Sequence, residues 1–329
     1  MAKLVTIFGG SGFVGRYIAR RMAKEGWRVR VAVRRPNEAL FVKPYGVVGQ
    51  VEPILANIRD EDSVRAAIQG ADAVINCVGT FDSGGKNNFD AVQRDGAARI
   101  AQIAAEEGAQ SLVHISAIGA DVESESLYGK SKGEGEAAVL EAFPGAMILR
   151  PSVIFGSEDG FFNRFAAMTR LGPVLPVAGA ETRFQPVYVD DVAQAAVQGA
   201  IGEAHGVYEL GGPDVESFRA LMQRMLGVIR RRRLILNIPF FVGGMMAAVL
   251  DFGQKITGGL FHNGILTRDQ LRSLRTDNVV QDGVQTFADL GIEPIAMEAV
   301  LESYLWPYRP SGQYSDIKES AQNLRVGNH

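Results

Sequence analysis

Three glycines near the amino terminus have the spacing of a turn that binds phosphates. Gly9, Gly12 and Gly15 lie between an apolar run at 4–8 and a helical pattern that begins at 13. In such a turn the first glycine allows a tight bend, the second lets a diphosphate approach the backbone, and the third lets the helix pack on the strand. The helix amino terminus adds free N–H groups. The alternative is a glycine-rich turn that holds no ligand. We expect dinucleotide contacts from Gly9, Ser11, Gly12, Phe13, Val14 and Gly15.

Two arginines follow the next apolar run, at 29–33. A site for NAD(H) places an acidic residue at this point, where it binds the ribose 2′-hydroxyl. Arg34 and Arg35 stand there instead, and a guanidinium matches a phosphate with two parallel hydrogen bonds. The sequence therefore predicts NADPH, with both arginines on its 2′-phosphate; the alternative is two solvated side chains on a turn. Arg16, just after the glycines, is a further candidate for the same phosphate pocket.

Two further segments join the candidate site by their position in the chain. Asn57 and Ile58 follow an apolar run at 51–55, where the adenine edge of a dinucleotide is expected. Val78 and Gly79 follow Asn76 at the end of the run that starts at 73, where the chain passes beneath the ribose. We expect Asn57, Ile58, Val78 and Gly79 to contact the nucleotide.

A tyrosine and a lysine four residues apart have the chemistry of a proton relay. Tyr128 and Lys132, at the start of a helix predicted over 129–143, share one helix face. The ammonium lowers the pKa of the phenol and hydrogen-bonds the nicotinamide ribose, so the tyrosine can pass a proton while hydride moves. Ser116, which follows the run at 111–115, is the natural third member. The pair is common by chance, so this interpretation depends on the glycine turn.

These residues require a scaffold in which strands alternate with helices. Apolar runs predict strands at 4–8, 29–33, 51–55, 73–78, 111–115, 146–149, 187–189 and 207–210. Helical patterns occupy 13–25, 60–69, 90–107, 129–143 and 190–201. Such alternation produces βαβ units and a parallel sheet. We predict an α/β fold, with a Rossmann-type doubly wound parallel sheet and a smaller, mostly helical C-terminal domain.

The alternation ends near residue 212, and helices and loops are expected beyond it. We predict an NADP(H)-binding Rossmann domain at 1–212, with 156–185 contributing to the second lobe. A C-terminal helical docking domain is predicted at 213–306. The polar stretch 307–329 is predicted to be a tail, either flexible or ordered by a partner.

The composition argues against several classes of protein. A net charge of −3 gives no general attraction for nucleic acid, and none is expected as a partner. The single cysteine, Cys77, rules out an internal disulfide framework. The four histidines are scattered singly, so no metal site is predicted. The chain runs from Met1 into an apolar strand without a signal or transit pattern, and we expect a cytoplasmic location.

Together these residues resemble the short-chain dehydrogenase/reductase superfamily, in its extended or atypical branch. The stretch 149–156, Leu-Arg-Pro-Ser-Val-Ile-Phe-Gly, is similar to the segment that runs beneath the nicotinamide. This resemblance implies a nucleotide contact from Pro151. The stretches 186–193 and 208–213 are typical of the same branch.

The C-terminal half resembles one family within that superfamily. Two successions, one at 157–165 and one that joins 266–270, 277–280 and 290–294, are similar to the NADPH-binding accessory subunit of respiratory complex I, of the alpha subcomplex subunit 9 type. The resemblance implies a firmly held nucleotide, no assigned turnover, and complex I partners at the junction of the peripheral and membrane arms. Tyr128 and Lys132 then become nucleotide ligands, and no catalytic residue is predicted. The start of the chain favours the bacterial form, peripheral on the cytoplasmic side of the inner membrane.

One basic and apolar segment is interpreted independently of the resemblance. Residues 217–250 contain six arginines, four of them at Arg230–Arg233, and no acidic residue. The apolar run at 234–250 is shorter than the roughly 20 residues that span a bilayer, and Pro239 interrupts it, so no transmembrane helix is expected. Either this segment docks on protein or on anionic lipid through Arg230–Arg233, or it is a buried helix with solvated arginines.

The function predicted from these features is that of a complex I accessory subunit that holds NADPH in a structural or regulatory role. Two alternatives remain: a free NADPH-dependent reductase or epimerase that uses Ser116, Tyr128 and Lys132, and a helper in quinone biosynthesis. The C-terminal half separates them, because a free enzyme needs a closed pocket for a small substrate. An assembly subunit needs an apolar, basic docking face, and this sequence shows more of the second.

Overall fold

The computed structural model describes residues 2–81, 84–245 and 267–314. By its contacts the chain divides into two compact units that alternate along the sequence. Unit 1 is formed by the described residues of Met1–Ser152, Val187–Gly211 and Asn278–Pro294. Unit 2 is formed by the described residues of Val153–Pro186, Gly212–Asp277 and Ile295–His329.

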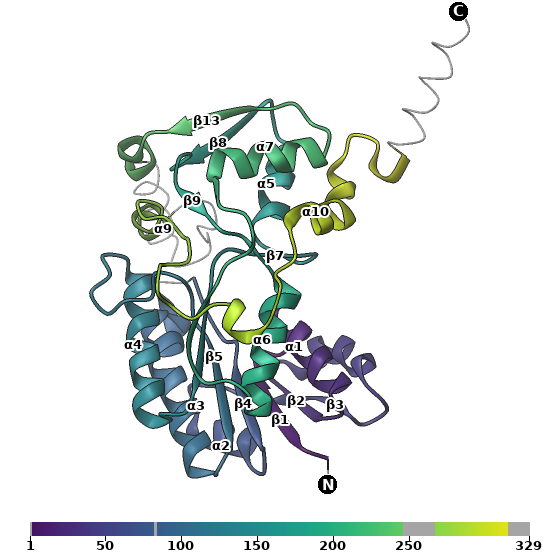
Figure 1. Ribbon diagram of the computed structural model, residues 1–329, viewed down its shortest axis with the longest axis vertical. Helices are drawn as coiled ribbons and strands as arrows, with labels where there is room; N and C mark the ends of the chain where they lie inside the picture. The colour runs from purple at the N-terminus through teal and green to yellow at the C-terminus, as the bar shows by residue number, and fades with distance from the viewer. Residues whose placement is uncertain (1, 82–83, 246–266, 315–329) are drawn as a thin grey trace, which may run out of the picture. The chain divides into compact units, whose positions relative to one another are not determined.

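A parallel sheet of seven strands forms the middle of unit 1 (Figure 1). The strand order is β3-β2-β1-β4-β5-β6-β11. The order reverses at β1, which pairs with β2 on one side and with β4 on the other, and doubly wound folds bind ligands in the crevice at this point. The predicted Rossmann-type α/β fold is confirmed. The strands are β1 (Leu4–Phe8), β2 (Arg28–Val33), β3 (Val51–Leu55), β4 (Ala73–Asn76), β5 (Ser111–Ile115), β6 (Met147–Pro151) and β11 (Gly206–Leu210).

Helices cover both faces of this sheet. On one face α1 (Phe13–Lys24) packs against α6 (Val189–Ile201), and on the other α3 (Asp95–Glu106) lies between α2 (Glu61–Ile68) and α4 (Leu127–Ala142) (Figure 1). Strand side chains alternate between the two faces. Those of Phe8, Val74, Leu112 and Ile148 belong to the buried cluster of the α2–α4 face. A 3-10 helix (Pro36–Tyr45) after β2, a π-helical turn (Asp90–Arg94) before α3 and the short strand β10 (Val187–Tyr188) complete these elements.

The segment Asn278–Pro294 belongs to unit 1, although the sequence placed 213–306 in one C-terminal domain. Long-range hydrogen bonds explain the difference. Ser152 Oγ donates to Asn278 Oδ1 at 2.7 Å, and the Gln281 backbone N–H donates to the Glu209 carboxylate at 3.0 Å. These partners are 126 and 72 residues apart in sequence, so no local pattern indicates the pairing.

Unit 2 combines short strands with helices. Its strands are β7 (Ile154–Phe155), β8 (Val174–Ala178), β9 (Arg183–Phe184), β12 (Glu216–Ser217) and β13 (Leu234–Ile238). Its helices are α5 (Phe162–Met168), α7 (Phe218–Val228), α9 (Arg268–Ser273) and α10 (Met297–Leu305). An aromatic cluster joins α5 to α7: the rings of Phe161 and Phe218 stack at 5.5 Å, and Phe165 packs edge-on against Phe218.

The stretch 157–165 is anchored to α10 by a buried carboxylate. Asp159 accepts hydrogen bonds from the backbone N–H groups of Phe161 and Asn163, at the start of α5. Its other oxygen accepts from the Tyr304 hydroxyl at 2.6 Å. Burial raises the pKa of Asp159, and these donors oppose that effect. The carboxylate therefore fixes both the start of α5 and the position of α10.

Strand β13 corrects one expectation of the sequence analysis. Only helices and loops were expected beyond 213, and one interpretation of the run at 234–250 was a buried helix. Leu234–Ile238 instead pairs in parallel with Val174–Ala178 of β8. Residues 240–245 are helical, and residues 246–250 lie outside the described part. In the part of the chain that the structure describes, no helix is both long and apolar enough to cross a bilayer.

Candidate functional site

The glycine turn between β1 and α1 has the backbone that its sequence predicts. Gly9 has φ +73°, a conformation that residues with a Cβ rarely adopt. Its N–H donates to the Ala32 carbonyl of β2 at 3.0 Å, and Gly12 N–H donates to the Gly9 carbonyl at 2.9 Å. A Cβ on Gly15 would collide with the Gly9 carbonyl oxygen and lie 2.7 Å from Gly10 Cα. Gly15 therefore lets the amino terminus of α1 reach the turn.

Substituting Gly15 with alanine is expected to displace this turn. Overpacking of this kind costs about 1–3 kcal/mol. We expect a comparable loss of folding free energy and roughly 10-fold weaker dinucleotide binding, because the diphosphate contacts move with the turn. Urea unfolding and nucleotide titration measure the two effects. The control is Gly227→Ala in α7, where a Cβ meets no atom within 4 Å. Unchanged binding in Gly15→Ala would contradict the role of the close approach.

Arg16 and Arg35, two of the three candidate arginines, make different kinds of contact. Arg16 supports the turn itself, because its Nε donates to the Gly12 carbonyl at 3.2 Å and its Nη2 to the Ser11 carbonyl at 3.1 Å. Arg35 pairs with Glu38 at 3.1 Å, with side chains 76% and 69% exposed. An ion pair so exposed contributes at most about 1 kcal/mol, so a phosphate can displace it.

Arg34 extends from the carboxyl end of β2 into solvent. Among the described residues its guanidinium has no ion-pair or hydrogen-bond partner. The glycine turn is hydrogen-bonded to Ala32, and Ala56 donates to the Val33 carbonyl at 2.9 Å. The ends of β1, β2 and β3 therefore meet beside Arg34.

The residues expected near adenine and ribose follow β3 and β4. Asn57 accepts from Arg59 N–H at 3.2 Å through Oδ1 and so shapes the turn that leads into α2. Ile58 packs against the α2–α4 cluster. Val78 Cγ2 would lie 3.3 Å from a Cβ on Gly9, and Gly79 is exposed next to the turn. The fold thus brings Val78 and Gly9 together, while Ile58 contributes mainly to the core.

A buried polar pair, Asn76 and His114, lies near the carboxyl edge of the sheet, on its α2–α4 face. Asn76 and His114 follow Val74 and Leu112 by two residues, so they face the same side. Asn76 Oδ1 accepts from Val78 N–H at 3.0 Å, and its Nδ2 lies 3.1 Å from His114 Nδ1. The amide nitrogen is the donor, which assigns the imidazole proton to Nε2. Burial, with Lys132 as a second cause, lowers the pKa of His114 to about 3.

The pKa of His114 predicts a defined acid sensitivity. Its folded value of about 3 lies below the ordinary value of 6.5, so protons bind to the unfolded chain first. The stability that depends on a neutral His114 is complete above pH 6.5 and is lost as the pH falls towards 3. Between pH 7 and 5 this residue should cost about 2 kcal/mol. His114→Gln should remove that part of the pH dependence in urea unfolding; the same slope in the variant would refute the assignment.

Ser116, directly after β5, has an unsatisfied hydroxyl. Its Oγ is buried and has no hydrogen-bond partner among the described residues, and the same is true of His114 Nε2. Buried polar atoms without a partner are rare and often indicate a ligand or a water at a site. Ser116 therefore fits a nucleotide or substrate contact, on the same face of β5 as His114.

Lys132 and Tyr128 lie at the start of α4. Ser126 caps this helix by accepting from Gly129 N–H. Lys132 is buried, its Nζ donates to the Ile115 carbonyl at 3.0 Å, and it lies 3.8 Å from the Cβ position of Gly79. Burial lowers its pKa to about 8, although Glu136 opposes the shift.

The pKa of Tyr128 is shifted in the opposite direction to the one expected from Lys132. Burial raises the pKa of the phenol to about 12. Its ring stacks on Phe81 at 5.3 Å and contacts Phe89 edge-on at 6.1 Å. The aromatic neighbours thus desolvate the phenol and favour its protonated form. In that state Tyr128 can donate a hydrogen bond or a proton at this edge.

A charged network continues from Lys132 under the sheet. Glu136, one turn further along α4, accepts three hydrogen bonds from Arg150 of β6, at 2.6–3.1 Å. Arg150 also lies 3.6 Å from Glu209 of β11, the residue it faces in the parallel register. Both carboxylates are buried. Sequence analysis did not identify this network, because the β6–β11 pairing that brings Arg150 beside Glu209 joins residues far apart in sequence.

The carboxyl edge of the sheet thus gathers the glycine turn, Arg34, Gly79, Ser116 and the Tyr128/Lys132 pair. Pro151 ends β6 on the same edge and accepts from Ile118 N–H at 3.1 Å. His114 is a neighbour that sequence analysis did not assign to the site, whereas Asn76 and Cys77 belong to the stretch that was expected beneath the ribose. No group of three residues able to hold a metal ion occurs in the described part of the chain.

Comparison with known proteins places this geometry in context. A family model described as NAD(P)H-binding matches residues 9–145. The alpha subcomplex subunit 9 of mitochondrial NADH dehydrogenase [ubiquinone] 1 from Arabidopsis thaliana is 35% identical over 94% of this chain and 79% of its own length. A ceramide reductase from Caulobacter vibrioides is 32% identical over 72% of this chain and 74% of its own.

The solved structures agree on the fold. The crystal structure of gox2253 has a TM-score of 0.70 at 18% identity, and covers 94% of this chain and 99% of its own. At that identity the likeness concerns the fold alone.

Proposed function

Because the chain belongs to the family of the complex I alpha subcomplex subunit 9, within the NAD(P)-binding short-chain dehydrogenase/reductase superfamily, we propose that it is an accessory subunit of complex I. It holds NADPH firmly, in a structural or regulatory role, and has no turnover of its own. Its partners are other complex I subunits at the junction of the two arms. It lies peripherally on the cytoplasmic face of a bacterial inner membrane. Identity of 35% over 94% of the chain is the observation that carries this proposal.

The preference for NADPH is supported by the end of β2. Arg34 and Arg35 stand where a 2′-phosphate would lie, and no acidic residue occupies either position. The loop after β2 offers Glu38, but that carboxylate already pairs with Arg35. A phosphate at this point replaces an exposed ion pair with charge-assisted, bidentate contacts.

The role of an assembly subunit is supported by unit 2. The stretches that carry the family resemblance make structural contacts in unit 2 and in unit 1. Thr267 begins α9 with a capping box, in which its hydroxyl accepts from Gln270 N–H and its N–H donates to Gln270 Oε1. Asp159 joins α5 to α10. These residues fix the scaffold of unit 2.

Affinity purification from detergent-solubilised membranes tests complex membership. A tagged full-length chain should bring the other complex I subunits and the NADH-oxidising activity with it. Recovery of the chain alone, from membranes in which complex I is intact, would refute membership.

A second candidate function is an NADPH-dependent reductase. The observation that favours it is the unsatisfied Ser116 hydroxyl beside a complete Tyr128/Lys132 pair, together with the similarity to a ceramide reductase. The bound nucleotide would supply hydride to a carbonyl carbon. Tyr128, protonated at neutral pH, would donate the proton to the oxygen, and Ser116 would orient it.

Tyr128→Phe separates the two functions. A reductase should lose at least about 100-fold in NADPH-dependent turnover of a ceramide-type lipid that carries a ketone, because general acid catalysis contributes that much. A complex I subunit should show no turnover before or after the change and should still be incorporated into the complex. NADPH oxidation with a ketone-bearing ceramide in detergent micelles, measured beside the purification above, gives both readouts.

A further inference from the structure

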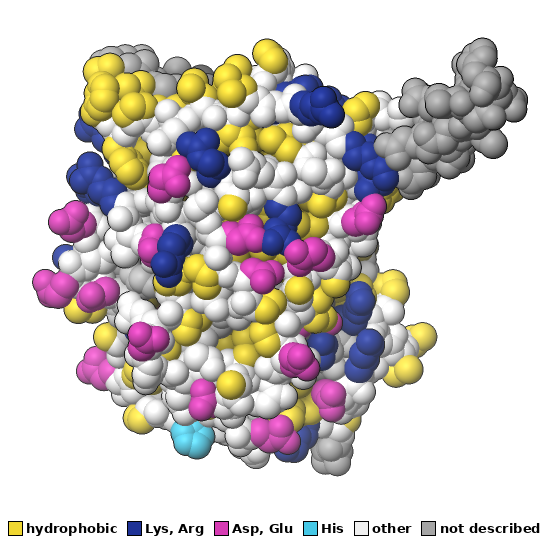
Figure 2. Space-filling view, turned by 45° about the horizontal axis from the view of Figure 1, so that its top comes forward, with side chains coloured by type: hydrophobic (Ala, Val, Ile, Leu, Met, Phe, Trp, Pro, Cys, Tyr) yellow, Lys and Arg dark blue, Asp and Glu magenta, His cyan; other side chains and the backbone are white. Residues whose placement is uncertain are grey.

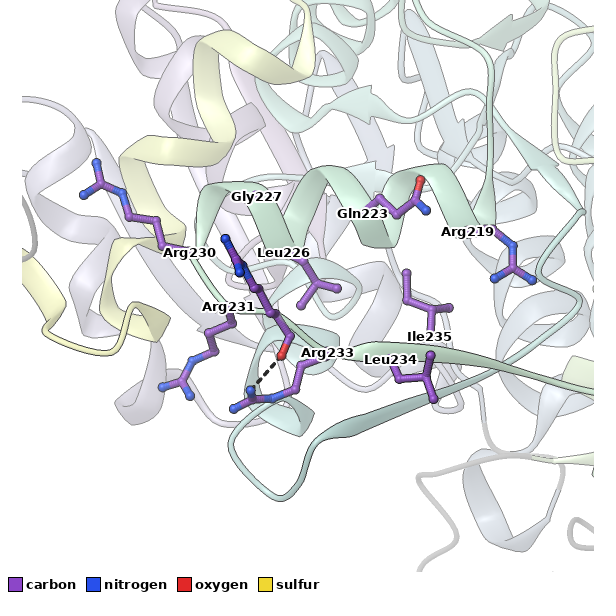
Figure 3. A pocket seen from close by; sticks show the side chains of 10 residues that line it. Arg219, Gln223, Leu226, Gly227, Arg230, Arg231, Arg233, Leu234 and Ile235 are labelled. Atoms are coloured by element: carbon purple, nitrogen blue, oxygen red, sulfur yellow. Dashed lines mark hydrogen bonds between the residues drawn. The ribbon is translucent and has the colours of Figure 1, made fainter.

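Unit 2 contains a basic groove that the nucleotide site does not use. It has a volume of about 730 Å³ and is formed by α7, by the turn that follows it and by the start of β13 (Figure 3). Five of its lining residues are arginines, Arg219 and Arg230–Arg233, and none is acidic. Burial, with Arg233 and Arg170 as further causes, lowers the pKa of Arg231, so the cluster repels itself. A surface of this kind requires an anionic partner.

Two arginines of the groove are held in place by neutral acceptors. Arg231 Nε donates to the Tyr308 carbonyl at 2.7 Å, and Arg233 Nε donates to the Thr169 carbonyl at 2.9 Å. Carbonyl oxygens orient a guanidinium without neutralising its charge. Arg219 has a carboxylate partner, the exposed Glu181 at 3.2 Å. The turn is thus built to present positive charge.

The guanidiniums spread apart instead of converging on one point. Arg219 extends from one end of α7, whereas Arg230 and Arg231 extend from the other end (Figure 3). Eleven helical residues separate the two ends by about 16 Å. A single phosphate cannot bridge this distance, so the groove fits an array of anionic groups.

An apolar face adjoins the basic groove. Leu234 and Leu236 of β13 are 65% and 51% exposed, and they share one side of the strand because they are two residues apart. In the parallel register they lie beside Val174 and Pro176 of β8, which are exposed as well. Figure 2 shows hydrophobic side chains in yellow gathered near dark blue Lys and Arg side chains in its upper part. Four apolar side chains therefore form an uncovered face directly after Arg233.

We propose that the basic groove and this apolar face form a surface that docks peripherally on an anionic phospholipid bilayer. Head-group phosphates meet the spread guanidiniums, and the exposed leucines enter the boundary between head groups and acyl chains. A bilayer supplies many mobile phosphates, which suits diverging arginines better than the fixed carboxylates of one protein. This rests on the peripheral membrane location of the proposed function and names the surface that makes the contact, while it requires neither the nucleotide nor complex I.

Vesicle flotation with the purified full-length chain tests this surface. Vesicles contain either phosphatidylcholine alone or phosphatidylcholine with phosphatidylglycerol. The chain should float with the second kind and not the first, and raised salt should release it. Arg231→Gln with Arg232→Gln should weaken the partition by roughly 30-fold, from the contribution of two charges near a surface. Leu234→Ser with Leu236→Ser should weaken it by roughly 10-fold.

A matched control removes the same charge from unit 1. Arg20→Gln with Arg28→Gln takes two exposed arginines from α1 and from the start of β2 and should leave flotation unchanged. Near-ultraviolet circular dichroism checks that each variant is folded. Equal flotation with both vesicle types would overturn the proposal. Absent flotation with both vesicle types would overturn it as well. If the groove variants were then lost from purified complex I, the surface would be assigned to a protein partner.

Discussion

Reversing the charge of Arg34 and Arg35 is expected to lower the affinity for NADPH by at least about 100-fold. One bidentate, charge-assisted contact contributes roughly 1.5–3 kcal/mol, and Arg34→Glu with Arg35→Glu removes two and adds repulsion. The affinity for NADH should change far less, because a glutamate at the end of β2 can accept from the ribose 2′-hydroxyl. Calorimetric titration of nucleotide-free protein with each dinucleotide measures the ratio.

The control for this result is Arg20→Glu with Arg28→Glu. Both residues are exposed, and Arg28 begins β2 at the edge of the sheet opposite to the glycine turn. The same change of net charge should therefore leave the ratio unaltered. Equal losses for NADPH and NADH in the Arg34/Arg35 variant would mean that the arginines act without recognising the 2′-phosphate.

Replacing Glu136 with alanine is expected to cost about 3 kcal/mol of folding free energy. Removal of one partner of a buried ion pair leaves an uncompensated charge, and such losses are about 3–5 kcal/mol. Arg150 keeps Glu209 at 3.6 Å, which places the effect at the lower end of that range. Lys132 also loses the carboxylate that favours its charged form, so its pKa should fall further. Urea unfolding of the nucleotide-free chain measures the loss.

Glu61→Ala provides the comparison. Glu61 pairs with Arg65 at 3.1 Å on the surface of α2, and such a solvent-exposed pair contributes little to the folding free energy. A loss below about 1 kcal/mol in Glu136→Ala would contradict the network, since a buried and a surface pair would then be equivalent.

The parallel sheet of unit 1 could be predicted because its signals are local. The runs at 4–8, 51–55 and 111–115 coincide with β1, β3 and β5, and Gly9, Gly12 and Gly15 lie in the turn where they were expected. A buried parallel strand is a short apolar run with a turn signal at each end, and both features lie within about ten residues.

The remaining features of the fold and of the candidate site depend on contacts between residues that are far apart in sequence. The sequence Leu-Ile-Leu-Asn-Ile of β13 lacks alternation, and a run so short does not distinguish strand from helix. Its strand state follows from the pairing with β8, about sixty residues earlier. The His114–Asn76 pair and the Arg150–Glu136 pair likewise join separate elements. Their roles require the register of the sheet, which composition does not contain.

Identification of the nucleotide that purifies with the chain tests the central claim most directly. The full-length protein is isolated without added nucleotide, any ligand is released by acid or heat, and the extract is separated beside standards of all four dinucleotides. We expect NADP(H), in a molar amount close to that of the protein. NAD(H) instead would contradict the role of Arg34 and Arg35, and an extract without dinucleotide would contradict the site itself.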